Sequence, residues 1–97
     1  MPSLSDKFGW GVKVVGTAEA QITTATTPLV SGILLVADPG NTGVIAIGGK
    51  GVTIDAVAAT DGIELNAGDA MAIPVSDASL IYAYASAAGQ RLSFFYI

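Results

Sequence analysis

The sequence predicts an all-β fold: a single small antiparallel β-sandwich of jelly-roll type, with about seven to eight short strands and little or no helix. Two observations lead to this fold class. Apolar and polar residues alternate with a period of two through most of the chain, which is typical of strands buried on one face. Gly, Asn and Asp gather in turns that separate these segments by about 8–12 residues. A chain of 97 residues accommodates one such domain.

Three strands are expected in the first half of the chain. The first covers residues 18–23, where Ala and Ile alternate with polar residues. The second covers Ile33–Ala37, a continuous apolar run that is typical of a strand buried on both faces. The third covers Val44–Ile47, between two glycines. Residues 49–62 are expected to form a loop that has room for a brief strand at residues 52–54.

Four further strands are expected at residues 63–65, 70–75, 80–85 and 92–97. The segments between them are rich in Gly, Asn and Asp, which accept positive φ or bond to their own backbone. The pattern does not establish which strands pair, because each short connection fits a hairpin within one sheet or a corner between two sheets.

The chain is expected to divide into an N-terminal arm, residues 1–10, and a β-sandwich domain, residues 11–97. Phe8 and Trp10 lie in this arm on either side of Gly9. Large aromatic side chains are costly to leave in water, so we expect both to dock on their own sandwich or on a neighbouring subunit.

The composition points to association rather than catalysis. The chain has no His and no Cys, so the usual general base, soft metal ligands and disulfides are missing, and we expect no enzyme activity, no metal and no cofactor. With a net charge of −4 and no basic cluster, we expect neither nucleic acid nor a membrane surface as a partner. Only 12% of residues are charged whereas 52% are hydrophobic, which predicts burial against another chain.

The sequence also lacks the marks of a membrane or secreted protein. The longest strongly apolar run, residues 33–37, is far shorter than the ~20 residues of a membrane helix. The N-terminus carries no apolar signal-peptide core, so we expect synthesis in a cytoplasm.

Two segments invite a chemical interpretation. Lys50 follows two glycines, but Gly51 stands where a phosphate-binding P-loop requires Ser or Thr, so a turn with a solvated lysine is favoured. Residues 65–74 resemble a turn of the cupin barrels. Metal cupins carry histidine ligands, and this chain has none, so the resemblance extends to architecture alone.

Four carboxylates, Asp55, Asp61, Glu64 and Asp69, fall within fifteen positions. The spacing of an EF-hand loop is absent, and turn formation accounts for these acids, although an irregular calcium site on the loops remains an alternative. A glycosidase with paired carboxylates needs a deep cleft, which a sandwich of this size seldom forms.

The aromatic residues are the candidate contact residues. Trp10, Tyr82 and Tyr84 could stack on sugar rings, but aromatic residues are also enriched at subunit interfaces, and the interface is favoured. The expected contacts are Phe8 and Trp10 for the arm, and the following residues for the subunit interface: Tyr82, Tyr84, Phe95 and Tyr96.

Four segments in order carry a resemblance to a known family: residues 41–49 (NTGVIAIGG), the Gly62-Ile63-Glu64-Leu65-x-x-Gly68-Asp69 turn, the tyrosine-containing strand at 80–85 and the terminal Phe-x-Tyr strand. Together they resemble the small jelly-roll capsid decoration (cement) proteins of tailed bacteriophages, over about residues 20–97.

The resemblance implies a homotrimer on the outside of a virion capsid, bound to the major capsid protein and stabilising the shell after synthesis in the host bacterial cytoplasm. Replacing Trp10 with alanine is then expected to weaken capsid attachment. The alternative function is a receptor-binding or glycan-binding β module on a phage tail or fibre, for which the aromatics have few polar neighbours.

Overall fold

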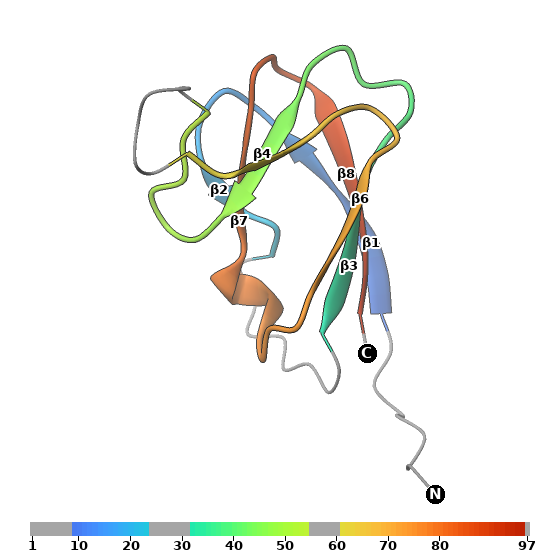
Figure 1. The fold of residues 1–97 in the computed structure, drawn as a ribbon, viewed down its shortest axis with the longest axis vertical. Coiled ribbons are helices and arrows are strands. Elements are labelled where there is room, and N and C mark those ends of the chain that lie inside the picture. The colour runs from blue at the N-terminus through green and yellow to red at the C-terminus, as the bar shows by residue number, and fades with distance from the viewer. Residues whose placement is uncertain (1–8, 24–31, 55–60, 97) are drawn as a thin grey trace, which may run out of the picture.

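The computed structural model confirms the predicted fold class, since the chain forms a small antiparallel β-sandwich (Figure 1). The structure describes residues 9–23, 32–54 and 61–96. Within them the elements are β1 (Gly9–Val15), β2 (Ala20–Gln21), β3 (Ile33–Ala37), β4 (Ile45–Gly48), β5 (Ile63–Leu65), β6 (Ala70–Ile73), a 3₁₀ turn η1 (Ala78–Leu80), β7 (Tyr82–Ala85) and β8 (Gln90–Tyr96).

The eight strands form two sheets of four, with order β1-β8-β3-β6 in sheet A and β2-β7-β4-β5 in sheet B. Each strand pairs with its mirror image along the chain: β1 with β8, β2 with β7, β3 with β6 and β4 with β5. The chain is therefore one long antiparallel ribbon folded over on itself. The additional pairs β3–β8 and β4–β7 complete the two sheets, which gives the eight-stranded jelly roll.

Aliphatic side chains from both sheets fill the space between them. The largest fully buried side chains are Val15, Leu35, Ile45 and Leu92, which come from β1, β3, β4 and β8. Burying each contributes about 1.5–3 kcal/mol. Every buried side-chain nitrogen or oxygen in the described part of the chain has a hydrogen-bond partner.

The strand β1 is absent from the sequence prediction, because two of its inward positions are glycines and the apolar alternation is broken there. The structure explains these glycines. A Cβ atom on Gly11 would lie 2.8 Å from the ring of Phe94, and one on Gly9 would overlap the ring of Tyr96. The two rings stack with their centroids 6.3 Å apart and occupy the inner face over β1.

The start of β1 also changes the boundary expected for the N-terminal arm. The sequence analysis ends the arm at residue 10, whereas β1 begins at Gly9 and places Trp10 within sheet A. Phe8 and the rest of residues 1–8 lie outside the described residues.

Four other expected elements differ from the structure. The prediction that β3 is buried on both faces is wrong, because Leu34 is 39% exposed on the outer face of sheet A. β2 is only two residues long, and the strand expected from residue 80 begins at Tyr82, since η1 precedes it. The brief strand expected at residues 52–54 is reduced to a single bridge between Thr53 and Asp61.

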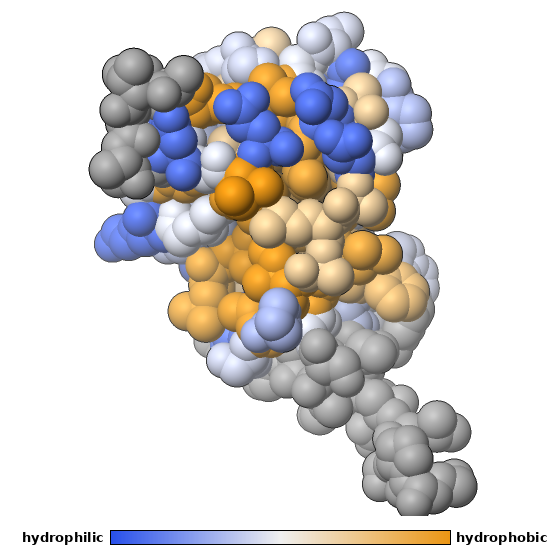
Figure 2. Space-filling view, viewed as in Figure 1, coloured by the Kyte–Doolittle hydropathy of each residue, from blue (hydrophilic) through white to orange (hydrophobic). Residues whose placement is uncertain are grey.

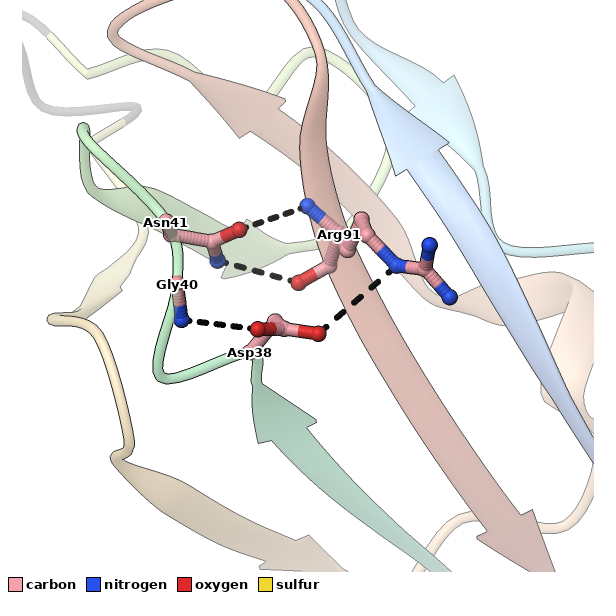
Figure 3. Close-up of polar contacts among 4 residues, drawn as sticks. All are labelled: Asp38, Gly40, Asn41 and Arg91. Atoms are coloured by element: carbon pink, nitrogen blue, oxygen red, sulfur yellow. Dashed lines mark hydrogen bonds and ion pairs between the residues drawn. The ribbon is translucent and has the colours of Figure 1, made fainter.

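Side chains from the turn after β3 hold the start of β8 in place (Figure 3). Asn41 acts like a strand neighbour of Arg91: its Oδ1 accepts from the Arg91 backbone N–H at 2.8 Å, and its Nδ2 donates to the Arg91 carbonyl at 3.0 Å. The buried Gln90 side chain accepts from the backbone N–H groups of Thr42 and Gly43 at 2.9 and 2.8 Å. These hydrogen bonds therefore attach the connection between β3 and β4 to the start of β8.

Candidate interaction surface

The outer face of sheet A is the most distinctive surface of the molecule. Strand alternation directs the odd-numbered residues of β3 into the core and the even-numbered residues outward. The register then aligns the outward side chains in rows across the sheet. We define the outer face of sheet A by two rows: Trp10, Phe95, Leu34 and Ala72; and Val12, Ser93, Val36 and Ala70.

These rows leave large apolar side chains exposed. Trp10 is 74% exposed, Val12 48% and Phe95 45%, and Val14, one step further along β1, is 61% exposed. Both rows consist of apolar residues except for one serine. Scattered surface hydrophobics need no explanation, but a contiguous group of this kind marks a surface that another molecule covers.

The outer face of sheet A is uneven, with two shallow hollows on either side of Phe95. One, of about 280 Å³, lies between β3 and β6, and its lining includes Gly32, Leu34, Ala72 and Pro74. The other, of about 270 Å³, lies between β1 and β3, and its lining includes Trp10 and Val12. The face therefore carries both a strongly exposed indole and an apolar recess.

Charged groups lie at the end of this face. Arg91 is in register with Val14, beyond the two apolar rows, and its Nε lies 3.6 Å from Oδ2 of Asp38. Figure 2, which has the same view as Figure 1, shows hydrophobic residues gathered over the half of the molecule where β3 and β6 lie and hydrophilic residues at the opposite end.

The structure brings together only part of the predicted interface. Trp10 and Phe95 are direct cross-strand neighbours on the outer face of sheet A. Tyr82 and Tyr84 lie in β7 of sheet B, on the other side of the sandwich, where both are half-buried. Tyr96 is turned toward the core, where it packs against the buried cluster and stacks on Phe94.

The outer side of sheet B is better covered than that of sheet A. Ala46 shares this side with its cross-strand neighbours Tyr84 and Glu64, and it is fully buried. A small side chain on an open sheet face would remain exposed. This side of the sandwich is therefore a weaker candidate for a large contact than the outer face of sheet A.

Two of the four acidic residues accept hydrogen bonds from residues close to them in the structure. Asp61 accepts a hydrogen bond from the Thr53 hydroxyl at 2.8 Å, and Asp69 accepts one from the backbone N–H of Asn66 at 2.9 Å. Asp55 lies outside the described residues. In the described part of the chain, no three acidic, His or Cys side chains are grouped so as to hold a metal ion.

The Lys50 segment is a turn in the structure. The backbone N–H of Val52 donates to the carbonyl of Gly49 at 3.1 Å, and the N–H of Gly51 donates to the carboxylate of Glu19. A partly polar hollow of about 270 Å³ lies beside this turn. An acidic side chain accepts the backbone N–H that a phosphate cradle would offer to an anion, which disfavours phosphate at this position.

No helix in the described residues is long and apolar enough to cross a membrane. Comparisons with protein-family models, with curated proteins and with solved structures gave no match. The functional argument therefore depends on the fold and on the outer face of sheet A.

Sequence reasoning identified two aromatic members of this face but missed its aliphatic members. Val12, Val14 and Leu34 were not among the candidates. A signal was present, since Trp10, Val12 and Val14 alternate with Gly and Lys, and that alternation marks a strand whose apolar side faces outward.

Proposed function

We propose that this chain is a non-enzymatic structural protein of a phage virion, a decoration (cement) protein that binds the outer surface of the capsid as a homotrimer and stabilises it. The observation that carries the proposal is the apolar outer face of sheet A. A protein with a contiguous apolar face and few charges is suited to permanent association, because interfaces are depleted of charged residues at their centre.

The fold supports the same proposal. Eight-stranded jelly rolls serve as viral capsid domains, among other uses, and they present a rigid double sheet rather than a mobile site. The resemblance expected from the sequence over residues 20–97 favours the capsid among those uses. A lectin-like function on a tail or fibre is the competing candidate.

Stabilising a capsid requires only a rigid protein with adhesive surfaces, which the composition of this chain supplies. A shell is held together by many weak lateral contacts, and a protein that contacts several shell subunits at once adds avidity without chemistry. Such a protein needs a packed core and adhesive surfaces. A trimer multiplies each surface by three, so modest contacts to the major capsid protein suffice for stable attachment.

Sedimentation with undecorated capsids tests the proposal. Purified protein is mixed with empty capsids of the phage that encodes it, the capsids are pelleted, and bound protein is quantified. We expect saturable binding, and we expect Trp10→Ala to lower the affinity at least tenfold, corresponding to about 1.4 kcal/mol, because a weakened apolar face lowers self-association and with it the avidity of the trimer for the shell.

Leu80→Ala is the matched control, because Leu80 is also an exposed large hydrophobic residue, at 55%, but belongs to η1. Its binding should equal that of the unmodified protein. A glycan array is run in parallel. Binding to sugars together with no binding to capsids would contradict the decoration proposal and favour the tail or fibre module.

A further inference from the structure

We propose that the outer face of sheet A is the surface through which copies of this chain associate, with Trp10 of one copy seated in the hollow between β3 and β6 of its neighbour. The occupant of this face is thus a second copy of the chain. The inference rests on the proposed function only in that both require self-association, and it names the surface that provides it.

The outer face of sheet A needs to be covered as soon as the chain has folded. Trp10 is the most exposed large hydrophobic side chain of the described residues, and it lies beside Phe95 and Val12. A shell partner is encountered only after a capsid has formed, whereas an exposed apolar patch promotes aggregation as soon as the chain has folded. A second copy is available from the start, and it covers the face immediately.

The shape of the outer face of sheet A also fits a second copy of the chain. Trp10 is strongly exposed at the β1 side, and the hollow of about 280 Å³, whose lining includes Leu34 and Ala72, lies at the β3–β6 side of the same face. A projection and a recess on one face allow each copy to give the projection to one neighbour and receive it from another. The contact is then complementary without any change in the sandwich.

The positions of Trp10 and of the hollow on the subunit bear on how many copies the assembly contains. When the two contact halves lie on opposite sides of a subunit, head-to-tail contacts generate an open filament or a large ring. When both halves lie on one face, all neighbours are on the same side, which favours a small closed ring over a filament. The homotrimer of the proposed function satisfies this condition with sheet A facing the threefold axis.

The area of the face is sufficient. Four strands about 4.8 Å apart and up to about seven residues long, at about 3.3 Å per residue, give a footprint on the order of 400 Å². The projecting aromatic rings, of about 150–250 Å² each, raise the accessible area to on the order of 500 Å². Two copies packed face to face then bury on the order of 1,000 Å², which is the lower limit for a specific interface, and three copies that direct this face to a common axis bury on the order of 1,500 Å² in total.

The edges of sheet A are protected, so the face is the favoured contact. Lys13 lies in the middle of the edge strand β1, in register with the buried Leu92 and therefore on the inner side. A lysine at such a position discourages the addition of another strand. At the other edge β6 ends at Ile73, and Pro74 follows with no N–H to offer to a neighbour.

Two variants, each with one half of the contact removed, test the proposal. Trp10→Ala removes the projection, and Ala72→Glu blocks and charges the hollow. Because both residues are exposed, neither change removes a core contact, and circular dichroism verifies the fold of each variant. We expect each variant alone to shift to a monomer in native mass spectrometry.

The mixture of the two variants gives the decisive reading. The intact Trp10 of the Ala72→Glu chain can enter the intact hollow of the Trp10→Ala chain, so we expect complexes that contain both variants. Ile63→Ser is the control, because Ile63 is as exposed as Val14, at 61%, but lies in sheet B. Its native mass should be unchanged.

A second reading needs no variant. Trp10 is the only tryptophan of the chain, so its fluorescence reports directly on this face. We expect blue-shifted emission in the assembled protein and a red shift on dilution to the monomer. Variants that keep the native mass of the unmodified protein, a mixture without mixed complexes, or emission independent of assembly would each overturn the inference. All readings use isolated protein, so failure to bind capsids does not affect them.

Discussion

At the scale of single residues, Gly9 and Gly11 explain how β1 can belong to sheet A. Their inward positions are filled by the rings of Tyr96 and Phe94, which reach over from the adjacent strand. Aromatic side chains that cover glycines on a neighbouring strand are a known means of fixing sheet register. Trp10 is held on the outer face because its two chain neighbours are directed inward beneath these rings.

Gly11→Val tests this arrangement. The new side chain would collide with the ring of Phe94, so we expect the free energy of unfolding to fall by about 1–3 kcal/mol, the usual cost of overpacking. In a double-mutant cycle with Phe94→Ala, part of the loss should be recovered, because removal of the ring makes room for valine. Chemical denaturation measures each of the four proteins.

Gly49→Ala provides the control for glycine replacement. Nothing lies within 4 Å of a Cβ atom at Gly49, and its backbone does not have positive φ. We expect its unfolding free energy to change by no more than about 0.5 kcal/mol. Equal losses for Gly11→Val and Gly49→Ala, or no coupling between residues 11 and 94, would show that the rings do not fix β1.

At the scale of elements, β3 shows how one strand serves both the core and the surface. It lies between β8 and β6 in sheet A, and its side chains alternate between fully buried Leu35 and exposed Leu34. Adjacent leucines therefore have different tasks. One holds the two sheets together, and the other belongs to the outer face of sheet A.

Alanine substitutions separate these two tasks. Leu35→Ala should lower the unfolding free energy by about 2–5 kcal/mol, the range for a buried leucine. Leu34→Ala should cost the dissociated chain less than about 1 kcal/mol but weaken self-association. Denaturation at concentrations low enough for dissociation, together with native mass at high concentration, distinguishes them. A large loss of monomer stability in Leu34→Ala would contradict the assignment of its side chain to the surface.

The sequence predicts most elements because turn residues and alternation are local signals. Residues 63–65 form β5 as expected, and alternation on β7 correctly separates its alanines from its tyrosines. β1 was missed because the apolar residues of its alternation lie on the outer side, and the groups that fill its inward positions, Phe94 and Tyr96, are more than eighty residues away in the sequence. The exposed side of β3 was missed since a continuous apolar run does not reveal which face is covered.

At the scale of the whole molecule, the jelly roll results from pairing each strand with its counterpart from the opposite end of the chain. The outermost pair joins β1 to β8, and the innermost joins β4 to β5. These long-range pairings depend on the closure of the entire ribbon and produce no local pattern. The class of fold could therefore be predicted from the sequence, whereas the strand order could not.

The candidate surface also belongs to this scale, because no single element contains it. Trp10 from β1, Phe95 from β8 and Leu34 from β3 become neighbours only when the ribbon is folded over. The sequence indicated which residue types take part, namely aromatics in a weakly charged chain. The separation of Tyr82 and Tyr84 from Trp10 and Phe95 could not be predicted without the topology.

The central claim is that the outer face of sheet A joins copies of this chain into a closed assembly. Light scattering of the purified, unmodified protein on a sizing column tests it most directly. We expect a single species of about three times the 9.7 kDa of the chain, with the same mass across a tenfold range of concentration. A well-folded monomer, or a mass that keeps growing with concentration, would contradict the claim.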